Sequence, residues 1–113
     1  MQRDTAALVW DPLHACEQIG EFTEGTTFED YASSALLRSA VERQFEIIGE
    51  ALNRLAAVDP ELGDTIPDLP RIVAFRNILV HGYASVDNAL VWQVLMDRLP
   101  VLSSVLRQLA DRA

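Results

Sequence analysis

The longest predicted helix, between residues 34 and 58, carries a wide apolar stripe that constrains the fold more than any other feature. Apolar side chains recur there every three or four residues, the spacing that places them on one face of an α-helix. The stripe comprises Ala40, Val41, Phe45, Ile47, Ile48, Ala51, Leu52 and Leu55. One neighbouring helix cannot cover a stripe of this width. We therefore expect a helix that Ser33 or Ser34 caps and that lies at the centre of a bundle.

The amino-terminal region predicts one helix and one short turn before this central helix. Helical spacing over about residues 5–22 is set by Leu8, Leu13, Cys16, Ile19 and Phe22. Pro12 interrupts the pattern, so either one helix kinks there or Asp11 caps a helix that starts at Pro12. Residues 28–31 predict a single helical turn, with Thr27 as its N-cap.

The carboxyl-terminal half predicts two more helices. Prolines and aspartates crowd residues 59–70, which indicates an irregular connection with one turn at residues 60–62. Pro70 suits the first turn of the next helix. Asp87 should cap a last long helix, which Pro100 should kink. The expected fold is all-α, an antiparallel four-helix-type bundle with short extra helical turns.

The composition limits the possible functions. The chain has 113 residues, half of them hydrophobic, which fits a single domain over residues 1–113. The net charge of −8 opposes broad nucleic-acid binding, so we expect no DNA partner and only a small basic cleft for any RNA. Cys16 is the only cysteine, and no signal peptide or apolar window of membrane length is visible. These features predict a cytoplasmic protein with no membrane span.

An arginine, a histidine and a tyrosine lie within eight residues near the end of the third long helix: Arg76, His81 and Tyr83. Arg76 and Tyr83 are seven positions apart and would share a face of a helix, whereas His81 would lie about 140° from Arg76. Gly82 could adopt a left-handed cap. In that case His81 closes the helix, Tyr83 emerges beyond it, and a long arginine can reach toward the helix end.

These residue types suit metal-free cleavage of RNA. A histidine titrates near neutral pH and can transfer a proton, so His81 is the candidate acid–base residue. Arg76 is the candidate catalytic and substrate-binding cation, because a guanidinium grips phosphate with two parallel hydrogen bonds. Asn77 could donate to the same phosphate or be an exposed polar residue. The alternative is structural, with His81 bound to a backbone carbonyl and Arg76 in a surface ion pair.

Two acids on the central helix are candidates for a supporting role. Glu46 and Glu50 are one turn apart, and Gly49 between them would allow a neighbouring helix to pack closely. Either acid could orient Arg76 or His81, or both could belong to a solvated face with local ion pairs. We expect no metal site and no cofactor, because two acids without a nearby histidine or cysteine make a weak site.

Two further residues have structural alternatives. His14 stands without partner ligands and is expected to be structural or exposed. Trp92 fits either core packing or an anchor at an interface.

The pattern Arg-x4-His-x-Tyr in an all-helical chain of this size resembles the HepT toxins of the HEPN superfamily. Other segments are similar to that family over nearly the whole chain. They are residues 46–51 (EIIGEA), 76–81 (RNILVH), 86–87 (VD) followed by 91–92 (VW), and 97–100 (DRLP) with Arg98 interposed. The resemblance implies a HEPN-like fold with a single first helix kinked at Pro12.

The resemblance also implies a function and its partners. It implies that the chain is the toxin of a toxin–antitoxin pair. It also implies a homodimer in which the helix that carries Arg76 and His81, here called the motif helix, meets its copy in the other subunit and forms one composite cleft for RNA. The partner is expected to be an MNT-type nucleotidyltransferase antitoxin that adenylylates Tyr83. The alternative is a non-catalytic helical subunit that binds a nucleotide phosphate for such a nucleotidyltransferase.

Overall fold

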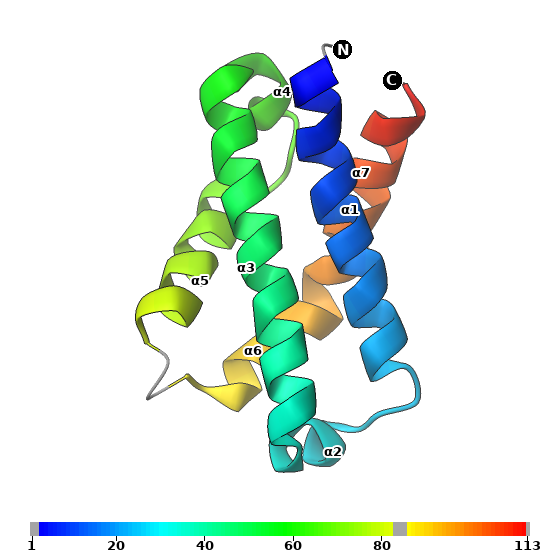
Figure 1. Ribbon diagram of the computed structural model, residues 1–113, viewed down its shortest axis with the longest axis vertical. Helices are drawn as coiled ribbons and strands as arrows, with labels where there is room; N and C mark the ends of the chain where they lie inside the picture. The colour runs from blue at the N-terminus through cyan, green and yellow to red at the C-terminus, as the bar shows by residue number, and fades with distance from the viewer. Residues whose placement is uncertain (1–2, 83–85, 113) are drawn as a thin grey trace.

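In the computed structural model the chain forms helices joined by short connections, and the structure describes residues 3–82 and 86–112 (Figure 1). Over these residues it contains no strand, which confirms the all-α prediction. The helices are α1 (Arg3–Thr23), α2 (Phe28–Ser33), α3 (Ala35–Val58), α4 (Pro60–Asp64), α5 (Leu69–His81), α6 (Asn88–Asp97) and α7 (Leu99–Asp111).

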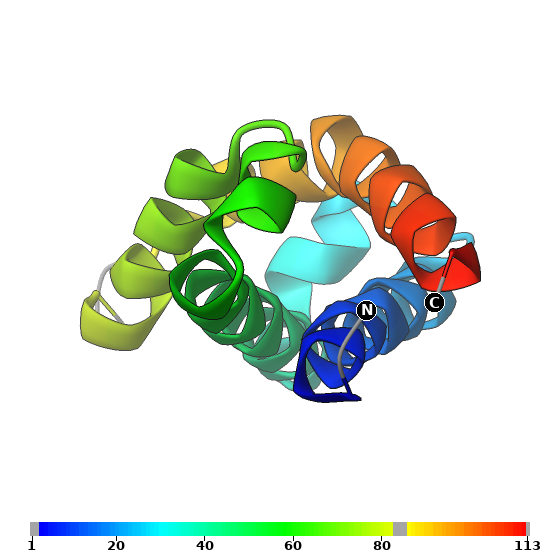
Figure 2. The same ribbon diagram turned by 90° about the horizontal axis from the view of Figure 1, so that it is seen from above.

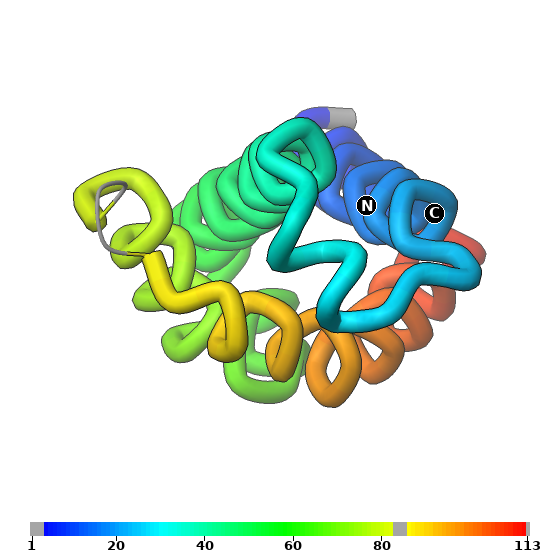
Figure 3. Tube along the Cα trace, turned by 90° about the horizontal axis from the view of Figure 1, so that it is seen from below, coloured from blue at the N-terminus to red at the C-terminus, as the bar shows by residue number. Residues whose placement is uncertain are grey.

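Helix α3 is the central element, as its wide apolar stripe predicts. It packs against α1, α5, α4 and α2, while α1 also packs against α7. Viewed from above, α1 and α3 lie side by side, with α7 beside α1 and α5 beside α3 (Figure 2). The view from below shows α2 crossing the lower end of the bundle next to α6 (Figure 3). The carboxyl-terminal end of α5 therefore projects at one side of the bundle.

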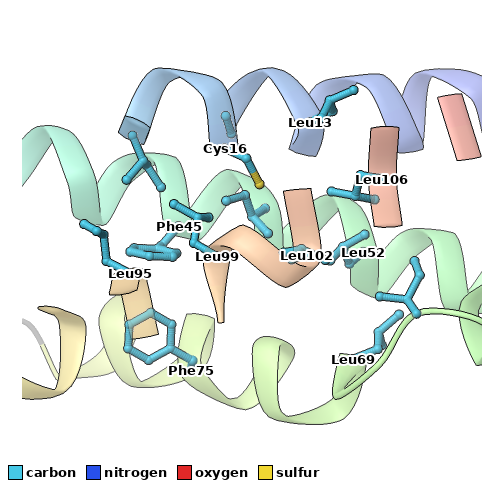
Figure 4. Close-up of a cluster of buried hydrophobic side chains, with 14 of the residues drawn as sticks. Leu13, Cys16, Phe45, Leu52, Leu69, Phe75, Leu95, Leu99, Leu102 and Leu106 are labelled. Atoms are coloured by element: carbon cyan, nitrogen blue, oxygen red, sulfur yellow. The ribbon is translucent and has the colours of Figure 1, made fainter. Parts of the chain in front are cut away.

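The core lies between these helices and is built almost entirely from aliphatic and aromatic side chains. Leu13 and Cys16 of α1, Phe45 and Leu52 of α3, and Leu102 and Leu106 of α7 all point into it (Figure 4). Between α3 and α5, the rings of Phe45 and Phe75 meet edge to face, with their centroids 5.2 Å apart. This contact fixes α5 against the middle of α3.

Side-chain caps set most helix starts where the sequence predicts them. Thr27 and Asp30 form a reciprocal capping box at α2. Ser34 accepts from the backbone N–H of Leu37 at the start of α3. The carboxylate of Asp87 accepts from the backbone of α6. Each cap satisfies N–H groups that have no partner within the helix.

Pro12 lies inside a continuous helix, whereas Pro100 lies at the start of a new one. Helix α1 continues through Pro12 as one helix, so Asp11 does not cap a helix of its own. The expected last helix is instead two helices, α6 and α7, which meet at Arg98 with a bend of 45°. Pro100 lies in the first turn of α7, where a missing N–H is tolerated, so the chain begins a new helix there.

No single helix in the described ranges is long and apolar enough to cross a membrane. Helices α6 and α7 together reach that length and composition, but they are bent and pack within the bundle.

The start of α5 is fixed by an ion pair and not by a side-chain cap. Asp68 precedes the helix in a left-handed conformation, with φ of 59°, and makes no capping bond. Its carboxylate instead accepts from Arg98 at the α6–α7 junction, at 2.5 Å. This contact ties the amino-terminal end of α5 to the last two helices.

Candidate functional site

Arg76 lies directly against the backbone of α3 at Gly49. A Cβ atom added to Gly49 would stand 2.7 Å from the Cγ of Arg76 and closer still to its Cβ. Real Cβ atoms do not approach other atoms this closely, so only glycine fits beneath the arginine. The Ile72 carbonyl oxygen, one turn earlier on α5, would lie at an ordinary 3.5 Å. The stem of Arg76 therefore crosses α3 at the one position of this helix that lacks a side chain.

Of the guanidinium nitrogens of Arg76, Nη1 is hydrogen-bonded, whereas Nε has no partner among the described residues. Its Nη1 donates to Asn77 Oδ1 at 3.0 Å. Its Nε is buried and has no hydrogen-bond partner among the described residues. A buried N–H without a partner is unfavourable and uncommon in folded proteins. The Nε group is therefore a buried donor without an acceptor among the described residues.

His81 is the last residue of α5 and is exposed to solvent. The helix ends there as predicted, and the Gly82 N–H donates to the carbonyl of Ile78 at 2.7 Å. The expected left-handed cap is wrong, because Gly82 has a φ of −105°. The backbone bond to Ile78 closes the helix without a positive φ. Tyr83 lies outside the described residues.

Arg76 and His81 occupy different faces of α5. The helix is continuous between them, so five positions rotate His81 about 140° from Arg76. Arg76 is half-buried against α3, whereas His81 is exposed. His81 shares its face with Ala74, seven positions earlier. Within one chain, the two residues are therefore aimed in different directions.

The two supporting acids make no hydrogen bond or ion pair with Arg76 within the described ranges. Glu46 is half-buried and pairs with Arg43, one turn earlier on the same helix, at 3.3 Å. Glu50 is exposed. Within the described ranges neither acid forms an ion pair or hydrogen bond with Arg76 or His81. The residue of this segment that contacts Arg76 is Gly49, as the sequence suggested for close packing.

The structure also places the two residues with structural alternatives. Trp92 is half-buried and packs on Tyr31 and Phe28, with ring centroids 5.5 Å and 6.2 Å apart. His14 is exposed beside Trp10, at 5.8 Å between ring centroids. The described residues contain no group of three or more His, Cys, Asp or Glu side chains that could hold a metal ion. His14 belongs to α1 and Trp92 to α6, so neither lies on the helix that carries Arg76.

Burial and nearby charges shift the pKa values of two side chains, Glu42 on α3 and Tyr31 on α2. Partial burial raises the pKa of Glu42, the negative charge of Glu46 raises it further, and Arg38 opposes both effects. Burial also raises the pKa of the Tyr31 phenol, with Glu42 adding to the shift and Arg38 opposing it. The fold therefore disfavours the charged form of Glu42.

An apolar groove of about 290 Å³ lies between α5 and the α6–α7 pair, and sequence reasoning did not identify it. Phe45 and Ile48 of α3 contribute to its lining, and its other apolar residues include Ile72, Phe75, Ile78, Leu90, Val94 and Leu102. Ile78 and Val101 remain 48% and 54% exposed. Arg71 and Arg98 also line it, in a chain of net charge −8. The sequence signal that could have indicated this groove is the set of apolar side chains on α5 and α7 that a thin bundle leaves exposed, such as Ile78 and Val101.

The groove and His81 lie on the same side of α5. Ala74 and Ile78 both line the groove, and His81 follows them by seven and three positions on the same helix. Arg76 points instead toward α3. A molecule that covered the groove would therefore lie next to His81.

The comparison with known families agrees with these features. The family model described as "Ribonuclease HepT-like" matches residues 13–109, which include the whole of α3 and α5. The chain belongs to the HepT-like ribonuclease family. This family membership places it among ribonucleases of the HEPN type.

Two curated relatives show how far the similarity extends. "Putative RNase MJ1380" of Methanocaldococcus jannaschii is 31% identical over 101 residues, which cover 88% of this chain and 90% of the relative. "Probable ribonuclease HepT" of Thermococcus cleftensis is 31% identical over 109 residues, covering 96% of this chain and 98% of the relative. No solved structure matches the chain significantly.

Proposed function

We propose that this HepT-like protein is the toxin of a toxin–antitoxin pair and a metal-independent endoribonuclease. The observation that carries the proposal is the Arg76 guanidinium, whose Nη1 lies at an exposed position beside Asn77, on the same helix as an exposed histidine. A phosphate oxygen is an acceptor that suits a guanidinium donor. The small basic site on an acidic chain also fits a nuclease that does not hold nucleic acid broadly.

In the proposed reaction, the 2′-hydroxyl oxygen of RNA attacks the neighbouring phosphorus while the bond to the 5′-oxygen breaks. His81 takes the proton from the 2′-hydroxyl or gives one to the departing 5′-oxygen. Arg76 binds the non-bridging oxygens, on which negative charge increases in the transition state. Asn77, whose Oδ1 accepts from Arg76, holds the tip of the guanidinium. The products are a 2′,3′-cyclic phosphate and a free 5′-hydroxyl.

We further propose that the working unit is a homodimer that associates through the apolar groove. The divergence of Arg76 and His81 within one chain supports a site that takes its arginine and its histidine from different chains. The exposed Ile78 and Val101 supply apolar area for such an interface. Because His81 lies on the groove side of α5, the histidine of one subunit would stand at the boundary with the other.

The proposed partner is an MNT-type nucleotidyltransferase that transfers an adenylyl group from ATP to the hydroxyl of Tyr83, with release of pyrophosphate. The added phosphate would place negative charge close to the motif helix, where it competes for Arg76 and repels RNA. Co-expression with the cognate enzyme should add one or more AMP masses to the peptide that contains Tyr83. Tyr83→Phe should prevent the addition. Complete neutralisation of the toxin without any mass increase would contradict this mode of control.

A cleavage assay tests the nuclease function. The purified protein should cut single-stranded RNA in EDTA, and His81→Ala should reduce the rate about a hundredfold or more. Growth arrest and RNA loss should appear together on induced expression in the cytoplasm. Undiminished cleavage by folded His81→Ala would remove the histidine from the mechanism. No cleavage by the wild type, alone or with its partner, would favour the non-catalytic subunit.

A further inference from the structure

We infer that Gly49 is a positioning residue for Arg76: the bare backbone of α3 sets the direction of the arginine side chain. The inference rests on the proposed function for its catalytic consequence, but the positioning itself is a property of the fold. It concerns a residue that touches neither substrate nor reacting atoms.

The contact is unusual because the crowded atoms belong to the functional side chain itself. A methyl group at Gly49 would overlap the Cβ and Cγ of Arg76, whereas the nearest backbone atom, the Ile72 carbonyl oxygen, is at 3.5 Å. Relief of the overlap must therefore move the arginine or the segment of α5 that carries it. The guanidinium lies at the far end of this stem, so a small displacement at Cγ is enlarged at Nε and Nη1.

The far end of the side chain has only one constraint among the described residues. Nη1 donates to Asn77 on the exposed face of α5, and the buried Nε has no partner. Asn77 belongs to the same helix as Arg76, so this bond cannot fix the arginine relative to α3. The contact at Gly49 provides that reference, and it keeps Nε buried beside the central helix.

Gly63, on α4, offers a matched control at another contact with α3. A Cβ at Gly63 would stand 3.0 Å from the Cα and 3.2 Å from the Cβ of Ala56, so α4 also packs tightly on α3. Gly63→Ala crowds a contact between helices without touching α5. Gly20, on α1, has open space around it and controls for the substitution alone.

The activity experiment compares Gly49→Ala with these two controls per mole of folded protein. Gly49→Ala should lower kcat for RNA cleavage about a hundredfold, the loss typical of a misplaced catalytic group, with a smaller change in KM. Gly63→Ala should lower stability but keep the wild-type kcat, and Gly20→Ala should keep both. Wild-type kcat in folded Gly49→Ala would overturn the inference.

A second readout does not depend on catalysis. In a nitrogen-15 NMR spectrum, Arg76→Lys identifies the Nε–H signal of Arg76 by its loss, and burial should make this proton exchange slowly. Gly49→Ala should shift the signal and accelerate its exchange, while Gly63→Ala leaves it unchanged. If the wild type cuts no RNA, the proposed function fails and this spectrum still decides the positioning. An unchanged Nε–H signal in Gly49→Ala would contradict the inference.

A double-mutant cycle covers the case in which Gly49→Ala does not fold. Arg76→Gly removes both atoms that the new methyl group would overlap. Gly49→Ala should therefore lower Tm strongly in the wild type and much less in the Arg76→Gly background, or the second change should restore folding. Equal losses in both backgrounds would show that another neighbour of Gly49 is responsible.

Discussion

Arg76 packs its Cβ and Cγ onto the backbone of Gly49, so the central helix, and not the motif helix alone, determines where the guanidinium lies. His81, five positions along α5, is exposed and has no comparable support among the residues that the structure describes. The two candidate catalytic residues therefore depend on the fold in different ways. Substitutions of Arg76 disturb a packed contact between helices, whereas substitutions of His81 leave the packing intact.

The first prediction separates these two effects. Arg76→Ala and His81→Ala should each lower RNA cleavage about a hundredfold or more. Thermal unfolding should show almost no change for His81→Ala, because the side chain is exposed. Arg76→Lys should keep the charge and most of the packing but lose the pair of parallel hydrogen bonds to phosphate. Its activity should therefore fall between that of the wild type and that of Arg76→Ala. Arg76→Lys with wild-type activity would argue that only the charge matters.

The second prediction concerns the apolar groove. Val101→Glu places a charge among its exposed apolar residues and should convert the proposed dimer to a monomer, as measured by light scattering. Leu36→Glu is the matched control, because Leu36 is 83% exposed and does not line the groove. Val101→Glu should also lose cleavage if the site is composite. A wild-type chain that is monomeric at micromolar concentration would exclude this assembly.

The positions of helices could be predicted from sequence because local signals determine them. Thr27, Ser34 and Asp87 cap helices where expected, since a cap depends only on residues within one turn. A kink at Pro100 was predicted, whereas the chain instead breaks into two helices at Arg98. Pro100 allowed a kink or a new helix start, and the pairing of Arg98 with the distant Asp68 belongs to the tertiary structure.

The site was predicted only in part, for a related reason. The spacing of Arg76 and His81 established that they diverge on one helix, and the structure agrees. The left-handed Gly82 cap was wrong, because a glycine permits a positive φ but does not require it. Spacing could not show which residue of α3 meets Arg76, since Gly49 and Glu50 differ by one position and face different surroundings.

The third prediction uses the raised pKa of Glu42. Because the folded state holds this proton more tightly than the unfolded state, stability from this group is greatest below the unfolded pKa of about 4.5 and falls as pH rises through the folded pKa. Glu42→Gln should therefore raise Tm near pH 7 and have little effect near pH 4. Glu50→Gln removes one charge from the exposed face of the same helix and controls for net charge. A gain that is larger at the lower pH would contradict the sign.

The fourth prediction concerns the buried thiol of Cys16. Burial raises its pKa to about 12, with a further contribution from Glu17. Little thiolate should form near pH 8, so a disulfide reagent should label the folded protein very slowly and the urea-unfolded protein at once. The labelling rate then reports opening of the core around α1. Rapid stoichiometric labelling without denaturant would show that the thiol is accessible.

The most direct test of a composite ribonuclease site mixes two inactive variants. Arg76→Ala and His81→Ala homodimers each lack one required group in both sites. A mixed dimer regains one intact site if Arg76 of one subunit works with His81 of the other, and random exchange of subunits should restore about a quarter of wild-type cleavage. Each variant alone provides the baseline. A mixture that exchanges subunits but remains as inactive as its components would contradict a site shared between two chains.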